Sequence, residues 1–204
     1  MRFKGIIIVA IYLVLSLVIL SNIPPVQQLG TTIRLIIFHG MLSMAGLYTN
    51  YAAGILGGLF LLTRREAWGR WSERLGLYFV VIWIIGTALS FVSMQVAWGG
   101  IVYEPLTVAA LTMVVLGLGK EYLVRSNNGT LRTFAIANAV FAAAVVVLRI
   151  TLSYVQSMGV VLHPDNPIGT SDSVIIRLLP MLLLVVTLLA IFEFARWQLK
   201  QRVN

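Results

Sequence analysis

The sequence contains no cysteine and little charge. Of its 204 residues, 11% are Asp, Glu, Lys or Arg, and only two are histidine. Without cysteine the chain cannot form disulfides, thiolate-held iron–sulfur clusters or the thioether link of a c-type haem. It also has no glycine-rich phosphate-binding loop and no evident pairing of a nucleophile with a base, so we expect neither nucleotide hydrolysis nor other enzymatic activity.

Long apolar runs dominate what is present. Hydrophobic residues make up 59% of the chain and the mean hydropathy is +0.94, a balance that excludes a soluble domain of this size. A helix needs about 20 apolar residues to cross the hydrocarbon of a bilayer. We therefore expect an all-α integral membrane protein with six transmembrane helices in a single domain, residues 1–204. The predicted helices cover residues 5–22, 33–62, 75–95, 105–124, 132–157 and 173–197.

The positive charge predicts the orientation of these helices. The formal net charge is +8, and all but three of the fifteen Lys and Arg residues lie near the two ends or in alternate connections. By the positive-inside rule both termini and these connections are cytoplasmic (N-in/C-in), so residues 23–32, 96–104 and 158–172 face outward. We expect this charge to meet membrane lipid and not nucleic acid. The residues concerned are Arg2, Lys4, Arg64, Arg65, Arg70, Arg74, Lys120, Arg125, Arg132, Arg196, Lys200 and Arg202.

The three remaining arginines are predicted at similar depth near the outer surface. Arg34 and Arg177 begin the second and sixth helices, and Arg149 lies about 17 residues along the fifth. Snorkelling to the headgroups explains Arg34 and Arg177 without any ligand. Arg149 is deeper and more costly to leave unpaired. Together the three arginines are candidates for holding an anionic ligand.

Both histidines are predicted at the outer face. His39 lies in TIRLIIFHGMLSM and His163 in the outer segment VVLHPDNPIGTSDS. An interhelical hydrogen bond would account for His39, and solvation for His163. Two neutral imidazoles can also ligate haem iron from opposite sides, with arginines pairing with the propionates. Glu104, Asp165 and Asp172 leave another metal site open, although a closed zinc site would lack thiolates.

Residues 95–105 read QVAWGGIVYEP, a short break between two apolar runs. Together with the R-x-x-x-x-H of the second helix, the basic loop after it and the histidine before the last helix, this segment resembles the haem-handling family of cytochrome c assembly proteins (CcmC/CcsA type). The chain is most similar to the six-helix CcmC type, over about residues 30–197. In that family a tryptophan-rich outer segment lies against the haem while two histidines ligate its iron.

The resemblance implies a haem site built from the matching positions. These are His39 and His163 as axial ligands, Trp98 and Gly99 at the opening of the tryptophan-rich motif, Tyr103 and Glu104 at its close, and Arg34 beside the haem edge. The motif is degenerate, because Gly100, Ile101 and Val102 replace its interior tryptophans. Isoleucine and valine supply shape without a broad π surface, so we expect haem affinity or haem type to differ from the family's.

The function implied by the resemblance is haem delivery in cytochrome c biogenesis. The protein would hold a non-covalent b-type haem at the extracytoplasmic side of the plasma (inner) membrane and pass it to a haem chaperone, with an ABC-type ATPase and permease as partners. Two other functions stay open: a haem b membrane anchor for electron transfer, and a transporter or assembly subunit without haem. A reducible Soret band separates the last from the others.

Overall fold

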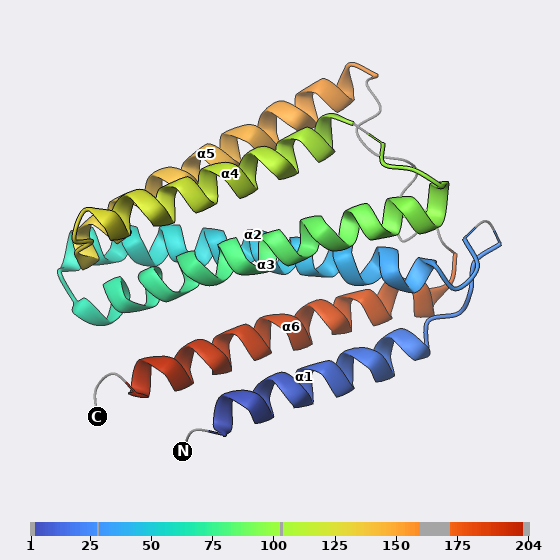
Figure 1. Ribbon diagram of the computed structural model, residues 1–204, viewed down its shortest axis with the longest axis horizontal. Helices are drawn as coiled ribbons and strands as arrows, with labels where there is room; N and C mark the ends of the chain where they lie inside the picture. Colours follow the sequence, from blue (N-terminus) through green and yellow to red (C-terminus); the bar gives the residue numbers. More distant parts are fainter. Residues whose placement is uncertain (1–2, 28, 103, 160–171, 202–204) are drawn as a thin grey trace. The chain divides into compact units, whose positions relative to one another are not determined.

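The structure is a computed structural model that describes residues 3–27, 29–102, 104–159 and 172–201. Within these ranges the chain forms six α-helices and no strand, apart from one isolated bridge between Val26 and Gly30. Each helix is long and apolar enough to cross a membrane, which confirms the predicted all-α fold class. The helices are α1 (Lys4–Ser21), α2 (Ile33–Thr63), α3 (Glu66–Trp98), α4 (Pro105–Ser126), α5 (Leu131–Ser157) and α6 (Val174–Gln201) (Figure 1).

Helix α3 begins at Glu66, whereas the sequence predicted its start at residue 75. The charged stretch EAWGRWSER, residues 66–74, is helical and not a loop. An ion pair of 2.8 Å between Glu66 and Arg70, one turn apart, stabilises its first turn. Gly69 lies in this turn against the ring of Phe60. Hydropathy marks the part of a helix that suits hydrocarbon, and it does not mark where the backbone hydrogen bonds begin.

The chain forms two compact units, both of which include parts of α2 and α3. The α1–α6 unit comprises residues 1–45, 85–102 and 165–204, and the α4–α5 unit comprises residues 46–84 and 103–164. The prediction of a single domain over residues 1–204 stays a prediction.

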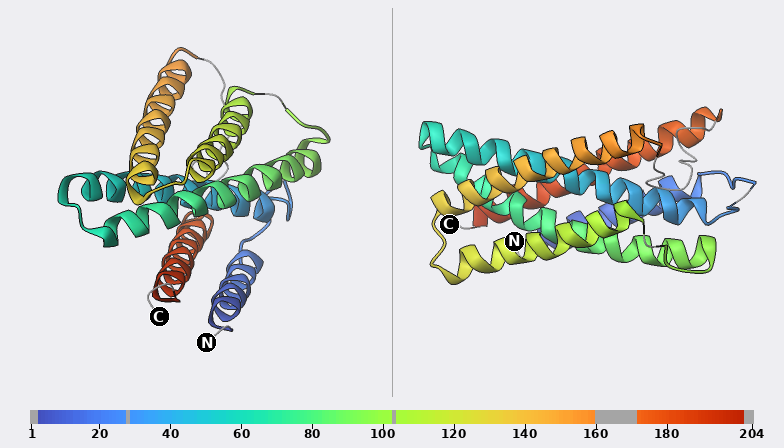
Figure 2. Two further views of the ribbon diagram at one scale, coloured as in Figure 1. Left: turned by 60° about the vertical axis from the view of Figure 1, so that its left-hand side comes forward. Right: turned by 90° about the horizontal axis from the view of Figure 1, so that it is seen from above.

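In the α1–α6 unit, helices α1 and α6 lie side by side (Figure 2). The hydroxyls of Thr187 on α6 and Tyr12 on α1 lie 3.4 Å apart, within hydrogen-bond distance, and Gly5 leaves room for the ring of Trp197. Apolar side chains from α1, the α1–α2 connection, α2 and α6 form the core of this unit. They are Ile19, Ile23, Ile33, Ile37, Met41, Ala45, Leu183 and Leu184.

In the α4–α5 unit, a chain of hydrogen bonds connects four helices. Ser72 of α3 donates to the backbone oxygen of Ala53 on α2 at 2.8 Å, and the Asn138 amide of α5 donates to the backbone oxygen of Ser72 at 2.8 Å. Lys120 of α4 donates to Oδ1 of Asn138 at 2.6 Å. Ser72 and Asn138 are fully buried, so their polar groups are satisfied by partners on neighbouring helices.

Lys120 corrects one assignment made from charge. The sequence placed it in a basic connection after the fourth predicted helix, but it lies within α4 with only 9% of its side chain exposed. Its ammonium group is 3.0 Å from the carboxylate of Glu121 and lies over the ring of Phe141. A lysine buried at this depth needs such partners, because an isolated charge would be costly to remove from water.

Glycines on α2 allow α5 to pack closely against it. A Cβ atom on Gly54 would collide with Cβ of Ala142, and one on Gly57 would lie 2.7 Å from the backbone oxygen of Ala135. Gly58 has no neighbouring atom within 4 Å of such a position. The spacing of Gly54 and Gly58, and of Ala53 and Gly57, predicts a small-residue face for close helix contact. The structure shows that Gly54 and Gly57 make the contact.

The exterior of the helices carries large apolar side chains. Leu62 on α2 is 83% exposed and Tyr122 on α4 is 72% exposed, and many valine, leucine and isoleucine side chains are exposed on α1 and α6. Water would not stabilise so much exposed apolar surface, whereas hydrocarbon would. Together with the six long apolar helices, this surface is typical of a multi-pass membrane protein.

Candidate functional site

His39 lies in the second turn of α2, half-buried in the α1–α6 unit. Its Nδ1 is 3.4 Å from Oγ of Ser93, a fully buried residue of α3. The hydroxyl of Ser93 donates its only proton to the backbone oxygen of Leu89 at 2.8 Å. Because that proton is used, the 3.4 Å contact is a hydrogen bond only in the tautomer of neutral His39 that carries its proton on Nδ1.

This proton position leaves the lone pair of His39 at Nε2. A histidine that binds a metal uses the lone pair of one ring nitrogen, and a hydrogen bond at the other nitrogen fixes its tautomer and ring orientation. Ser43 fixes the backbone in addition, since its hydroxyl donates to the backbone oxygen of His39 at 3.0 Å. This tautomer is the one in which a histidine can bind a metal through Nε2.

Trp98 and Gly99 form the C-terminal end of α3, which the sequence had placed in an outer loop of residues 96–104. Gly99 has φ +72° and its N–H donates to the backbone oxygen of Gln95 at 3.1 Å, so it ends the helix in the left-handed conformation that favours glycine. Trp98 is 40% exposed at this end. The start of α2 and the end of α3 lie at the same end of the α1–α6 unit (Figure 1).

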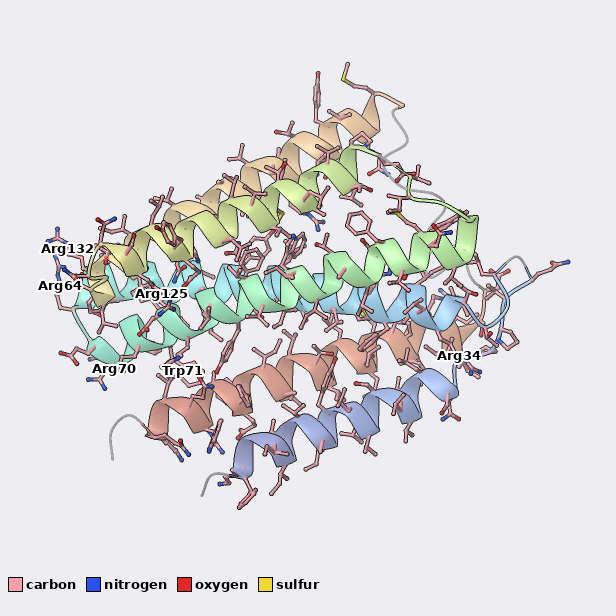
Figure 3. All side chains as sticks on the ribbon, viewed as in Figure 1. Arg34, Arg64, Arg70, Trp71, Arg125 and Arg132 are labelled. Carbon is pink, nitrogen blue, oxygen red and sulfur yellow. The ribbon has the colours of Figure 1, made fainter. Side chains whose placement is uncertain are left out.

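Arg34 lies in the first turn of α2, at this same end of the unit (Figure 3). It is half-buried, and its Nε donates to the backbone oxygen of Ile23 at 3.0 Å, which ties the α1–α2 connection to α2. The two Nη groups are its remaining donors. Arg177 lies in the first turn of α6, where its Nη2 donates to the backbone oxygen of Asp172 at 3.4 Å.

Glu104 precedes Pro105 at the start of α4, in the α4–α5 unit. Its backbone oxygen accepts from the N–H of Val108 at 3.0 Å, but its side chain makes no capping hydrogen bond. Glu104 therefore caps α4 through its backbone alone. Its side chain is half-buried and lines an open groove of about 530 Å³. The other residues lining the groove are Pro105, Val108, Ala109, Thr112, Leu148 and Leu152.

Arg149 continues the inward face of α5. The residues before it on the same face, Asn138, Ala142 and Val145, are spaced three or four apart and are buried, whereas Arg149 is exposed. Its neighbour Leu148 lines the groove beside Glu104. The charge of Arg149 thus lies on the face that α5 turns toward other helices, and not on its apolar outer face.

The predicted site residues are divided between the two units. Arg34, His39, Trp98, Gly99 and Arg177 belong to the α1–α6 unit, and Glu104 and Arg149 belong to the α4–α5 unit. His163 and Tyr103 lie outside the described residues. In the described part of the chain, no three His, Asp or Glu side chains gather as a metal site of several ligands would require. Ser93, which contacts His39, is a residue of the candidate site that the sequence did not predict. The sequence feature that could have pointed to it is a serine in an otherwise apolar part of a helix.

The chain matches no protein-family model, no curated protein and no solved structure in comparisons with known proteins.

Proposed function

We propose that this protein binds haem at the extracytoplasmic surface of the membrane and delivers it during cytochrome c biogenesis. His39, through Nε2, and His163 would hold the haem iron. The observation that carries the proposal is the contact between His39 and Ser93, which leaves the lone pair on the nitrogen that can ligate iron. Ligation by two imidazoles holds a b-type haem without a covalent bond, so the haem can leave again.

The surroundings of His39 suit a flat, anionic ligand. The exposed ring of Trp98 offers an apolar surface, and Gly99 lets the backbone approach a planar ring. In this unit the Nη groups of Arg34 and the guanidinium of Arg177 are the candidate partners of the propionates. Arg149 is a further candidate by its charge, and Tyr103 and Glu104 are assigned to the haem by the resemblance alone.

The proposed orientation follows from the distribution of charge. Arginines near the α2–α3 and α4–α5 connections favour a cytoplasmic position for these connections and for both termini, which places the end with His39 outside the plasma (inner) membrane. A haem chaperone would then receive the haem, and an ABC-type ATPase and permease would drive its release. These partners come from the resemblance of the motif around Trp98 to the cytochrome c assembly family. No enzymatic reaction is part of the proposal.

The direct test is the absorption spectrum of the purified protein. The protein should be expressed with haem supplied, purified in detergent and mixed with apomyoglobin as a haem-accepting probe. We expect a six-coordinate low-spin spectrum, a reducible Soret band and transfer of haem to apomyoglobin. A colourless protein would contradict haem binding. Haem that stays bound but is rapidly oxidised by a quinone would support an electron-transfer anchor instead.

Replacement of Ser93 by alanine is expected to lower haem affinity about tenfold, the effect of removing a partner that orients a metal-binding histidine. The variant removes the acceptor of the Nδ1 proton, so the imidazole loses its fixed tautomer and orientation. Haem titration followed at the Soret band measures this change. Ser90→Ala is the matched control, because Ser90 lies one turn earlier on α3 and its hydroxyl donates to the backbone oxygen of Thr87 at 2.7 Å. Equal losses in the two variants would contradict a specific role for Ser93.

A further inference from the structure

Three arginines of the α4–α5 unit lie exposed without a carboxylate partner. Arg64 and Arg65 form the connection between α2 and α3, and Arg132 lies in the first turn of α5. In the described part of the chain, the ion pairs formed within 4.0 Å involve other basic residues. These three guanidinium groups are available for an external anion. They are referred to below as the arginine triad.

Other arginines of the same unit are neutralised by their own helix. Arg70 is 2.8 Å from Glu66, and Arg125 is 3.0 Å from Glu121. Positive charge alone would serve to orient the helices in the membrane whether or not it was paired. The unit therefore carries both paired and unpaired arginines, and at the end with the α2–α3 and α4–α5 connections the arginine triad has the full charge that an anionic ligand needs.

Arg64 occupies a backbone conformation that usually favours glycine. Its φ is +58°, and its N–H donates to the backbone oxygen of Phe60 at 2.8 Å, which closes the C-terminus of α2. Asn128, which follows the end of α4, has a similar φ of +51°. Asparagine tolerates this left-handed conformation better than arginine does. An exposed arginine at position 64 gains no packing in return for this strain. Its side chain therefore contributes something other than stability.

The arginine triad lies at the level where helices leave hydrocarbon. Leu62, two residues before Arg64, is 83% exposed and suits contact with acyl chains. Trp68 and Trp71 lie in the first turns of α3 and are typical of the headgroup region. Arg64, Arg125 and Arg132 are found at the same end of the α4–α5 unit (Figure 3). These side chains suit the boundary between acyl chains and headgroups of a bilayer. A phosphate group is the anion that a bilayer presents at this boundary.

We propose that the arginine triad binds the phosphate group of an anionic phospholipid. The planar guanidinium donates two parallel hydrogen bonds to phosphate oxygens, which a lysine at these positions could not do. The acyl chains would lie against the apolar side chains of the last turn of α2, including Leu62. This site goes beyond the proposed haem function and does not depend on it.

The test is a titration of the full-length protein in detergent with phosphatidylglycerol, and separately with phosphatidylcholine, followed by native mass spectrometry. We expect the wild type to bind phosphatidylglycerol more tightly. Each substitution Arg64→Gln, Arg65→Gln or Arg132→Gln should weaken this binding about fivefold, and the three together about 100-fold. Arg70→Gln is the matched control, because it removes the same charge from the same end but from an existing ion pair, and its affinity should stay near that of the wild type.

Arg64→Gly separates binding from folding. Glycine suits the positive φ, so we expect this variant to unfold at a higher temperature than the wild type and still to lose about fivefold in phosphatidylglycerol affinity. Asn128→Gly should leave that affinity unchanged. An equal loss in Arg70→Gln and Arg64→Gln would overturn the site in favour of a diffuse positive potential. Equal affinity of the wild type for the two lipids would also overturn it, and would leave an acidic protein segment as the candidate partner.

Discussion

Replacement of Gly57 by valine is expected to destabilise the protein by about 3 kcal/mol, because it overpacks the contact between α2 and α5. A Cβ atom at this position would lie 2.7 Å from the backbone oxygen of Ala135 and 3.1 Å from Oγ of Ser72. Backbone atoms cannot rotate away as a side chain can, so the two helices must separate. Their separation would also strain the hydrogen bonds that connect Ser72 with Ala53 and with Asn138.

Gly58→Val is the matched control for this prediction. It makes the same chemical change in the next residue of α2, where no atom lies within 4 Å of the new Cβ. The change in helix propensity is the same in both variants and cancels in the comparison. Unfolding in a detergent series, followed by circular dichroism, gives the two stabilities. Equal stability of the two variants would contradict the close α2–α5 packing in the structure.

Replacement of His39 by alanine is expected to lower haem affinity more than about 100-fold, beyond the usual effect of losing a residue that only supports a metal ligand. The variant removes Nε2 itself, and the haem that still binds should change from six-coordinate low-spin to five-coordinate high-spin on the remaining ligand. His163→Ala should have the same effect from the opposite side of the ring. Haem titration and the absorption spectrum measure both changes.

Adding free imidazole to a variant with a smaller residue at position 39 distinguishes loss of the iron ligand from loss of the fold. His39→Gly leaves space where the side chain was, so free imidazole should restore the low-spin spectrum if the rest of the site is intact. Ser43→Ala is a useful companion, because it removes a hydrogen bond to the backbone of His39 and leaves the imidazole in place. A wild-type spectrum in His39→Ala would show that this histidine does not ligate the haem.

Hydropathy was sufficient to predict the six helices but not all of their ends. Hydropathy places the start of α3 too late, because the charged residues Glu66 and Arg70 of its first turns do not look like part of an apolar span. Lys120 was placed in a connection for the same reason, although Asn138 and Glu121 satisfy its ammonium group within α4. Charge counting cannot recognise this buried polar network, because Asn138 comes from another helix and only the fold brings it to Lys120.

The small residues of α2 show the same limit in packing. Their spacing predicted a close-packed face, yet Gly58 lies in open space while Gly57 contacts α5. A spacing of three or four residues selects one side of a helix, but it does not say which neighbour covers which turn. That information came from the fold.

Residue type and motif predict the candidate site residues, but they do not predict that Ser93 contacts His39. His39 attracts attention as one of two histidines in the chain. Its contact with Ser93 joins residues 54 positions apart on two antiparallel helices, and no local pattern connects them. The tautomer of His39, on which the proposed iron ligation depends, could therefore be inferred only once α2 and α3 were placed beside each other.

The central claim is that Nε2 of His39 ligates haem iron, and the electron paramagnetic resonance spectrum of the ferric protein tests it most directly. Wild-type protein loaded with haem is predicted to give the rhombic low-spin signal of bis-histidine ligation, and His39→Ala loaded in the same way is predicted to give an axial high-spin signal. The same low-spin signal in both proteins would contradict the account, because the iron would then take its ligands from other residues.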